Sequence, residues 1–147
     1  MIPFKTLLAP ILWGLLIMAL LTACTPTVML PGPQTVTASI HEHVFITSDN
    51  IQLPVRMWLP EKAPKSIIIA LHGFNDYSLF FESSAQSLTA QGIASFAYDQ
   101  RGFGQAPNTG IWAGAHTMAQ DLVEFIKLIK KHHPFTPIYL LGESMGG

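Results

Sequence analysis

Along residues 43–147, short apolar runs alternate with stretches in which apolar residues recur every three or four positions. These two patterns predict the secondary structure of this region. Short apolar runs predict β-strands over residues 43–47, 51–59, 66–71, 93–98 and 138–141. Longer stretches, in which apolar residues recur at three- and four-residue intervals, predict helices over residues 79–91 and 118–132. A hairpin followed by strand, helix, strand, helix and strand indicates an α/β fold with a mostly parallel sheet, right-handed crossovers and helices on both faces.

Three local signals refine these elements. Residues 66–71 are apolar on both faces, which favours a central parallel strand. Pro54 has no backbone N–H, which indicates a sheet edge or a bulge in the second strand. Thr117 and Gln120 have the spacing of a capping box, which predicts that the second helix begins beside Thr117.

The N-terminus has the pattern of a targeting segment. Leu7 to Leu21 is a nearly continuous apolar run, shorter than the roughly 20 apolar residues of a membrane-spanning helix, so a signal peptide is the better interpretation. Leu21-Thr22-Ala23-Cys24 follows and resembles a bacterial lipobox. The resemblance implies cleavage before Cys24, lipidation of Cys24 and a membrane anchor in the bacterial cell envelope, with Thr25 favouring the outer membrane. An uncleaved anchor with a chance cysteine is the alternative.

The chain is therefore divided into three parts. Residues 1–23 are expected to be the signal peptide and residues 24–38, rich in Pro and Thr, an extended tether. Residues 39–147 are expected to form the folded domain.

Composition excludes several classes of function. The net charge of −1 gives no electrostatic case for nucleic-acid binding. Cys24 is the sole cysteine, which excludes an intrachain disulfide framework and a multi-cysteine metal site. His41 and His43 are one strand step apart, but no third metal ligand is evident near them. We expect neither a metal nor a cofactor.

The last residues contain the most informative motif. Gly142-Glu143-Ser144-Met145-Gly146 follows an apolar run and has the G-x-S-x-G pattern of a nucleophile elbow. A sharp turn from strand to helix forces the serine into a strained conformation and exposes its hydroxyl group. The first amides of the following helix are then free to hold an oxyanion.

Other polar residues also follow predicted strands. His72-Gly73-Phe74 follows one strand and Asp99 another, so both should lie with Ser144 at the carboxyl edge of the sheet. We interpret His72 as ordering its loop rather than accepting a proton. Asp99 precedes the serine, whereas the catalytic acid of this arrangement follows it, so Asp99 is interpreted as a loop-structuring carboxylate. Glu143 is interpreted as an anion at a helix start.

Together these motifs resemble the α/β-hydrolases, and among them the branch of monoacylglycerol lipases, lysophospholipases and serine aminopeptidases. The elbow, His72-Gly73 and the run Asp99-Gln100-Arg101-Gly102-Phe103-Gly104 carry the resemblance. It implies that Ser144 is the nucleophile and that the backbone N–H groups of Phe74 and Met145 form the oxyanion hole. Phe74 is bulky where the family often has a small residue, which would narrow the acyl site.

The resemblance covers the N-terminal half of such an enzyme. No histidine follows Ser144, so we expect the chain to be a truncated fragment that is inactive or nearly so by itself. The favoured function is a lipid-anchored serine hydrolase for carboxylic esters such as monoacylglycerols or lysophospholipids. A non-catalytic envelope lipoprotein or pseudogene product and a peptidase of the same branch stay open. An epoxide hydrolase or dehalogenase is disfavoured, because those folds place aspartate at the position of Ser144.

Overall fold

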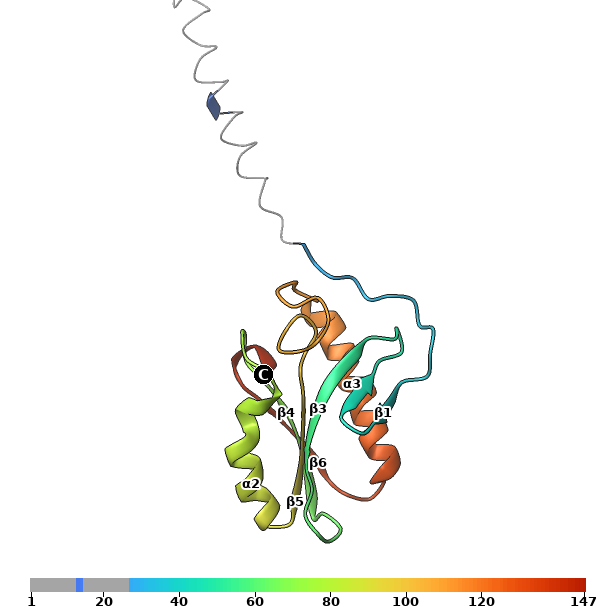
Figure 1. Ribbon diagram of the computed structural model, residues 1–147, viewed down its shortest axis with the longest axis vertical. Helices are drawn as coiled ribbons and strands as arrows, with labels where there is room; N and C mark the ends of the chain where they lie inside the picture. The colour runs from blue at the N-terminus through green and yellow to red at the C-terminus, as the bar shows by residue number, and fades with distance from the viewer. Residues whose placement is uncertain (1–12, 15–26) are drawn as a thin grey trace, which may run out of the picture.

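The computed structural model describes residues 13–14 and 27–147, and within them the chain forms one mixed sheet between helices (Figure 1). The strands run in the order β1-β2-β3-β5-β4-β6 across the sheet. Their bounds are Ser39–His41 for β1, Val44–Ile46 for β2, Gln52–Trp58 for β3, Ser66–Leu71 for β4, Ile93–Tyr98 for β5 and Ile138–Gly142 for β6. The expected α/β architecture is confirmed.

The parallel part of the sheet is centred on β4. This strand pairs in parallel with β5 on one side and with β6 on the other. The first three strands form an antiparallel meander, and β3 joins it to β5. The expectation of a central parallel strand at residues 66–71 is therefore correct, because this strand needs apolar side chains on both faces.

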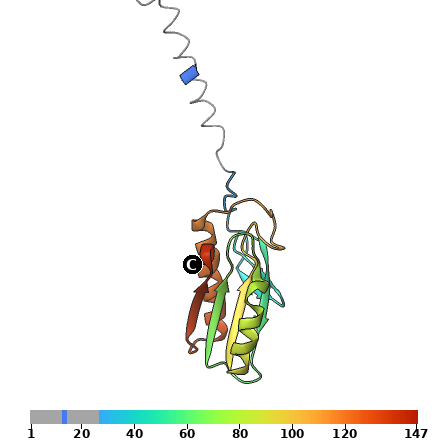
Figure 2. The ribbon, with the colours of Figure 1, turned by 90° about the vertical axis from the view of Figure 1, so that its left-hand side faces the viewer.

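Helices cover both faces of the sheet (Figure 2). The 3-10 turn η1, Ser78–Phe81, leads into α2, Glu82–Ala90, and α3 spans Ala115–His132. Alternate residues of β4 supply the two cores: Ile67 and Ile69 belong to the cluster that contains Phe125 of α3, whereas Ala70 packs with Ala85 of α2. A last 3-10 turn, η2, spans Ser144–Gly146.

Several local expectations need correction. The second helix begins at Ala115, three residues earlier than expected, and its N-cap is Gly114 with no side-chain cap. The capping box was therefore the wrong signal: Thr117 is buried within the first turn, and Met118 of the same turn packs with Phe103 and Ala113 of the preceding loop. The helix expected at residues 79–91 is divided into η1 and α2. The strand β1 was not predicted.

Pro54 is not at a sheet edge, and on the β2 side it occupies a regular ladder position opposite Val44. β3 is an interior strand, and its pairing with β5 begins only at Val55, opposite Tyr98. The carbonyl of Pro54 accepts the backbone N–H of Asp99, the residue just beyond β5. Proline is tolerated because its missing N–H faces the point where β5 has ended.

The segment expected to be an extended tether follows the surface of the domain over residues 28–36. Val28 forms a parallel bridge with Trp112, and the N–H of Met29 donates to the Trp112 carbonyl. Farther along, the N–H groups of Thr35 and Val36 both donate to the carbonyl of Ser48. Among the described residues, no helix is both long and apolar enough to cross a membrane.

Candidate functional site

Ser144 lies directly after β6, in the tight turn that the G-x-S-x-G pattern predicts. Its φ of 50° is in the left-handed region, which is costly for a residue with a side chain. The turn is held by the N–H of Glu143, which donates to the Leu71 carbonyl at 3.0 Å, and by the N–H of Gly146, which donates to the Glu143 carbonyl at 2.8 Å. Ser144 is exposed to solvent. The strained geometry matches the expected elbow, and the nucleophilic role of Ser144 stays a prediction.

The two glycines of the pattern are required by close backbone contacts. A Cβ on Gly142 would lie 2.2 Å from the carbonyl oxygen of Gly146. A Cβ on Gly146 would lie 2.4 Å from the carbonyl oxygen of Leu71 on the neighbouring strand. Both distances are far inside van der Waals contact, so the turn can be this tight only without side chains at these positions.

The loop after β4 lies against this turn. A Cβ placed on Gly73 would be 3.6 Å from the Cβ of Ser144 and 3.5 Å from the Glu143 carbonyl oxygen. Within the described part of the chain, neither Phe74 nor Met145 donates its backbone N–H to a hydrogen bond. Within that part, both amides are therefore free to donate, and both lie on segments next to Ser144. Their role in an oxyanion hole stays a prediction.

His72 is held inside the loop by hydrogen bonds at both ring nitrogens. Its side chain is fully buried, Nδ1 lies 2.8 Å from the carbonyl oxygen of Gly73, and Nε2 accepts the N–H of Gln100 at 2.9 Å. Because Nε2 accepts, the proton belongs on Nδ1, which donates to Gly73. The side-chain amide of Gln100 also donates to the carbonyl of His72. This geometry agrees with a histidine that orders the loop.

Asp99 accepts hydrogen bonds from two loops, the one that leads into η1 and the one that follows β5. Its Oδ1 accepts the N–H of Ser78, at the start of η1, and its Oδ2 accepts the N–H of Gln105, each at 2.8 Å. The carboxylate is only 2% exposed. This arrangement agrees with a loop-structuring role.

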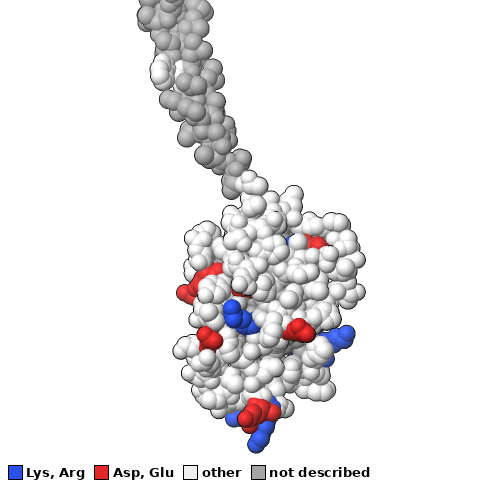
Figure 3. All heavy atoms as spheres, in the orientation of Figure 1, with Lys and Arg blue, Asp and Glu red and all other residues white. Residues whose placement is uncertain are grey.

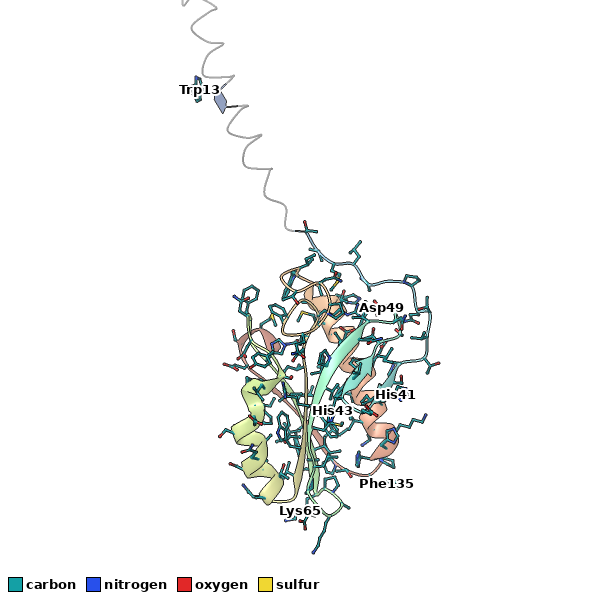
Figure 4. All side chains as sticks on the ribbon, in the orientation of Figure 1. Trp13, His41, His43, Asp49, Lys65 and Phe135 are labelled. Atoms are coloured by element: carbon teal, nitrogen blue, oxygen red, sulfur yellow. The ribbon has the colours of Figure 1, made fainter. Side chains whose placement is uncertain are left out.

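Arg101 forms a buried ion cluster with Asp49 and Asp121, which the sequence motifs did not predict. The guanidinium donates through Nη1 and Nη2 to both carboxylate oxygens of Asp49, at 2.7 and 2.6 Å. Through Nε and Nη2 it also donates to both oxygens of Asp121, at 2.6 and 2.8 Å. The cluster joins the loop after β5 to the β2–β3 turn and to α3 (Figure 4 labels Asp49).

Burial and the ion pairs act in opposite directions on these groups. Burial alone would raise the pKa of Asp49, but hydrogen bonds from Arg101, Thr47 and the N–H of Gly32 hold it well below its usual value. For Asp121 burial is the larger effect, and its pKa is raised. Burial lowers the pKa of Arg101, but the two carboxylates more than offset this, so it stays charged.

One sequence signal points to this cluster. Asp121 lies three residues after Met118 and four before Phe125, on the apolar stripe of α3, where an unpaired carboxylate would be costly. Such a position demands a cationic partner. The sequence does not say which basic residue supplies it.

An apolar hollow of about 530 Å³ lies beside the elbow. Its lining comes from β4, the loop before α3, α3 itself and the elbow, and includes Leu71, Trp112, Met118, Leu122, Leu140 and Met145. The hollow is open to solvent on the side of Leu140, which is 53% exposed.

The remaining candidates lie elsewhere. His41 and His43 flank the β1–β2 turn on exposed positions (Figure 4), and the described residues contain no group of three His, Cys, Asp or Glu side chains suited to a metal ion. Cys24, the expected lipidation site, falls outside the described residues.

Comparisons with known proteins agree with this geometry. The family model described as serine aminopeptidase, S33, matches residues 62–147. Monoglyceride lipase from Homo sapiens is 31% identical over 104 residues, which are 70% of this chain and 34% of the relative. Monoacylglycerol lipase from Mycolicibacterium smegmatis is 27% identical over 119 residues, covering 76% of this chain and 40% of the relative. The chain thus spans about a third to two-fifths of these relatives.

Solved structures show the same fold. A soluble variant of monoglyceride lipase from Saccharomyces cerevisiae, in complex with a substrate analog, superposes with a TM-score of 0.62 at 23% identity, covering 79% of this chain and 40% of that one. A thermostable carboxyl esterase from Bacillus coagulans gives a TM-score of 0.60 at 24% identity, covering 76% and 38%. The fold is therefore part of an α/β-hydrolase fold. With the family model matching more than half of its residues, this chain belongs to the serine aminopeptidase S33 family of α/β-hydrolases, in the branch that includes the monoglyceride lipases.

Proposed function

We propose that this protein is a serine hydrolase that cleaves carboxylic esters of the monoacylglycerol or lysophospholipid type. The observation that carries the proposal is the strained, exposed Ser144, with φ of 50°, placed against the Gly73 loop. Strained backbone at a glycine-flanked serine is a recurring feature of serine nucleophiles.

In the proposed reaction, Ser144 Oγ attacks the ester carbonyl and gives its proton to a general base. The oxyanion that forms accepts hydrogen bonds from the N–H groups of Phe74 and Met145. The alcohol then leaves with a proton from the same base, and water hydrolyses the acyl-enzyme. Ser144 Oγ has no hydrogen-bonded histidine among the described residues. We therefore assign the base and its carboxylate partner to a part of the enzyme outside this sequence.

The apolar hollow beside the elbow supports an acyl substrate. Its lining side chains are mainly aliphatic, aromatic and thioether groups, which fit a hydrocarbon chain rather than a charged group. Because monoglyceride lipases are among the relatives of this protein, a long-chain monoester is the first substrate to test.

Labelling with a fluorophosphonate tests the nucleophile directly, because only an activated serine reacts. We expect the full-length protein to be labelled and Ser144→Ala to lose the label completely. Ser83→Ala, a change at an exposed serine of α2, is the matched control and should keep it. An unlabelled wild type would favour the non-catalytic lipoprotein instead.

Peptide hydrolysis is the second candidate, because the matching family model is that of a serine aminopeptidase. The same acyl-enzyme could form from either bond. Turnover of a p-nitrophenyl ester and of an aminoacyl p-nitroanilide by the full-length protein, before any fluorophosphonate is added, separates the two. We expect turnover of the ester.

The proposal places the enzyme in the bacterial cell envelope, anchored through lipidated Cys24. In cells fed an alkyne fatty acid, the wild-type protein should incorporate the label and Cys24→Ser should not. An uncleaved anchor predicts membrane association without the label and without a change in mass.

A further inference from the structure

We propose that an apolar rim at the carboxyl edge of the sheet rests on a lipid surface and holds the mouth of the site against it. The rim is formed by four exposed side chains: Val28, Leu30, Phe74 and Ile111, which are 41, 79, 64 and 38% exposed. The inference rests on the proposed function, because it takes the N-terminal segment to be held at a membrane.

The rim is continuous with the elbow. Phe74 packs edge-on against Phe103 at 5.4 Å between ring centroids, and Phe103 packs against Trp112 at 6.4 Å. Trp112 bridges to Val28 and lies in one apolar cluster with Met145. A surface that covers the rim therefore also covers the entrance beside Ser144.

The four rim side chains are uncharged, and the acidic residues beside them are Asp76, two residues after Phe74, and Glu143, which lies against Gly73. Residues 25–40 and 102–114 contain no Asp, Glu, Lys or Arg. In Figure 3 charged atoms lie around the middle and at the lower end of the domain, and acidic atoms also lie in the half nearer the N-terminal segment. A rim of exposed, uncharged aromatic and aliphatic side chains suits the boundary between headgroups and acyl chains, rather than a charged protein partner.

Chain length limits how far the rim can lie from the membrane. Cys24 is four residues before Val28, so a lipid on Cys24 lies within about 14 Å of Val28. Even if the apolar run stayed uncleaved, its end at Leu21 is seven residues before Val28, or about 25 Å at full extension. Because Val28 is bridged to Trp112, the same maximum distance from the membrane applies to this edge of the domain. The edge that carries Ser144 therefore faces the membrane.

This orientation narrows the substrate class. An amphiphilic ester with its acyl chain in the lipid layer could enter the apolar hollow without crossing water. A water-soluble ester would gain nothing from the orientation. We therefore expect a preference for esters presented in a lipid layer.

Site-specific quenching tests the contact without any use of activity. Once any other free cysteine has been replaced by serine, a cysteine introduced into the full-length protein can be labelled alone with a fluorophore. We expect Leu30→Cys and Ile111→Cys labels to be quenched about twofold or more by brominated lipids in vesicles of neutral phospholipid. Lys62→Cys, in the loop between β3 and β4 at the opposite end of the domain, should not be quenched.

The outcomes separate the inference from the proposed function. Unquenched labels at positions 30 and 111 on vesicle-bound protein overturn the inference, as does equal quenching at position 62. Self-association of the rim in place of quenching, seen by cross-linking the labels between copies, also overturns it. Quenching in a protein that fails to react with fluorophosphonate keeps the lipid contact and rejects the hydrolase.

A substitution tests the effect on substrate supply. Leu30→Asp should lower hydrolysis of vesicle-embedded ester about tenfold, because a charge replaces an apolar contact with lipid. Hydrolysis of a short soluble ester should stay unchanged. An equal effect on both substrates would show that Leu30 acts on the domain and not on the lipid contact.

Discussion

Arg101 is the residue whose environment differs most from what its sequence context suggests. Its side chain is 3% exposed and lies between two carboxylates from the β2–β3 turn and α3. The cluster has one positive and two negative charges, so removing the cation leaves two buried carboxylates without compensation. Such losses are among the most destabilising single changes.

We therefore expect Arg101→Met to lower the free energy of unfolding by about 3–5 kcal/mol. Arg56→Met is the matched control, because Arg56 is exposed on β3 and should change stability by less than about 0.5 kcal/mol. Urea denaturation of the two variants measures the difference. Equal effects would mean that the ion cluster contributes nothing specific.

Asp49 makes the stability depend on pH. Because its pKa in the folded protein lies below its ordinary value of 3.8, the ionised form stabilises the fold at pH above 3.8. This stabilisation decreases as the pH drops from 3.8 toward the lower pKa that Asp49 has in the folded protein. Asp49→Asn should therefore be less stable than wild type at pH 6, and the gap should narrow below pH 3.8. A gap that is constant with pH in urea melts would contradict this assignment.

At the scale of the element, the elbow is a strand and a turn that fit only with glycine at two positions. β6 delivers Ser144, and the neighbouring strand β4 limits the turn through the Leu71 carbonyl. The strain at Ser144 is supported by parallel pairing of the two strands along their length. The Leu71 carbonyl therefore both packs against the turn and limits the position of Ser144.

Gly146→Ala should disrupt the elbow, because its Cβ would lie 2.4 Å from the Leu71 carbonyl oxygen. We expect a loss of about 1–3 kcal/mol in stability and a large loss of fluorophosphonate labelling. Gly32→Ala is the control, since its Cβ would meet only Asp49 at an ordinary 3.5 Å. Thermal melts and labelling in parallel check both effects, and normal labelling of Gly146→Ala would refute the steric argument.

At the scale of the whole molecule, β6 forms one edge of the sheet within the described residues. Tyr139, Leu140 and Leu141 on this strand are 60, 53 and 40% exposed. An apolar strand with an unpaired edge is a site of self-association.

We expect the 147-residue chain, expressed by itself, to self-associate through β6 and to show little or no esterase activity. Leu140→Lys should reduce light scattering at a given concentration, because a lysine on an edge strand opposes pairing. Val123→Lys makes the same charge change at an exposed position of α3, 48% exposed, and should have a much smaller effect. An equal reduction by both variants would attribute the effect to net charge.

Features that depend on neighbouring residues could be predicted from the amino-acid sequence. The strands at residues 66–71 and 93–98 were predicted at their observed bounds, because a buried parallel strand is apolar on both faces. The elbow was also predictable, since its glycines and serine lie within five residues. The order of the elements then determined the α/β class and the edge of the sheet that carries the site.

Contacts between distant segments could not be predicted, because they depend on how the chain folds in three dimensions. Arg101 and Asp49 are 52 residues apart, and neither local pattern specifies the other. The start of α3 followed its packing on the preceding loop rather than the Thr117 capping signal. The segment over residues 28–36 is held by backbone hydrogen bonds to Trp112 and Ser48. Local periodicity records which face of an element is buried, whereas the identity of its partners depends on how the whole chain closes.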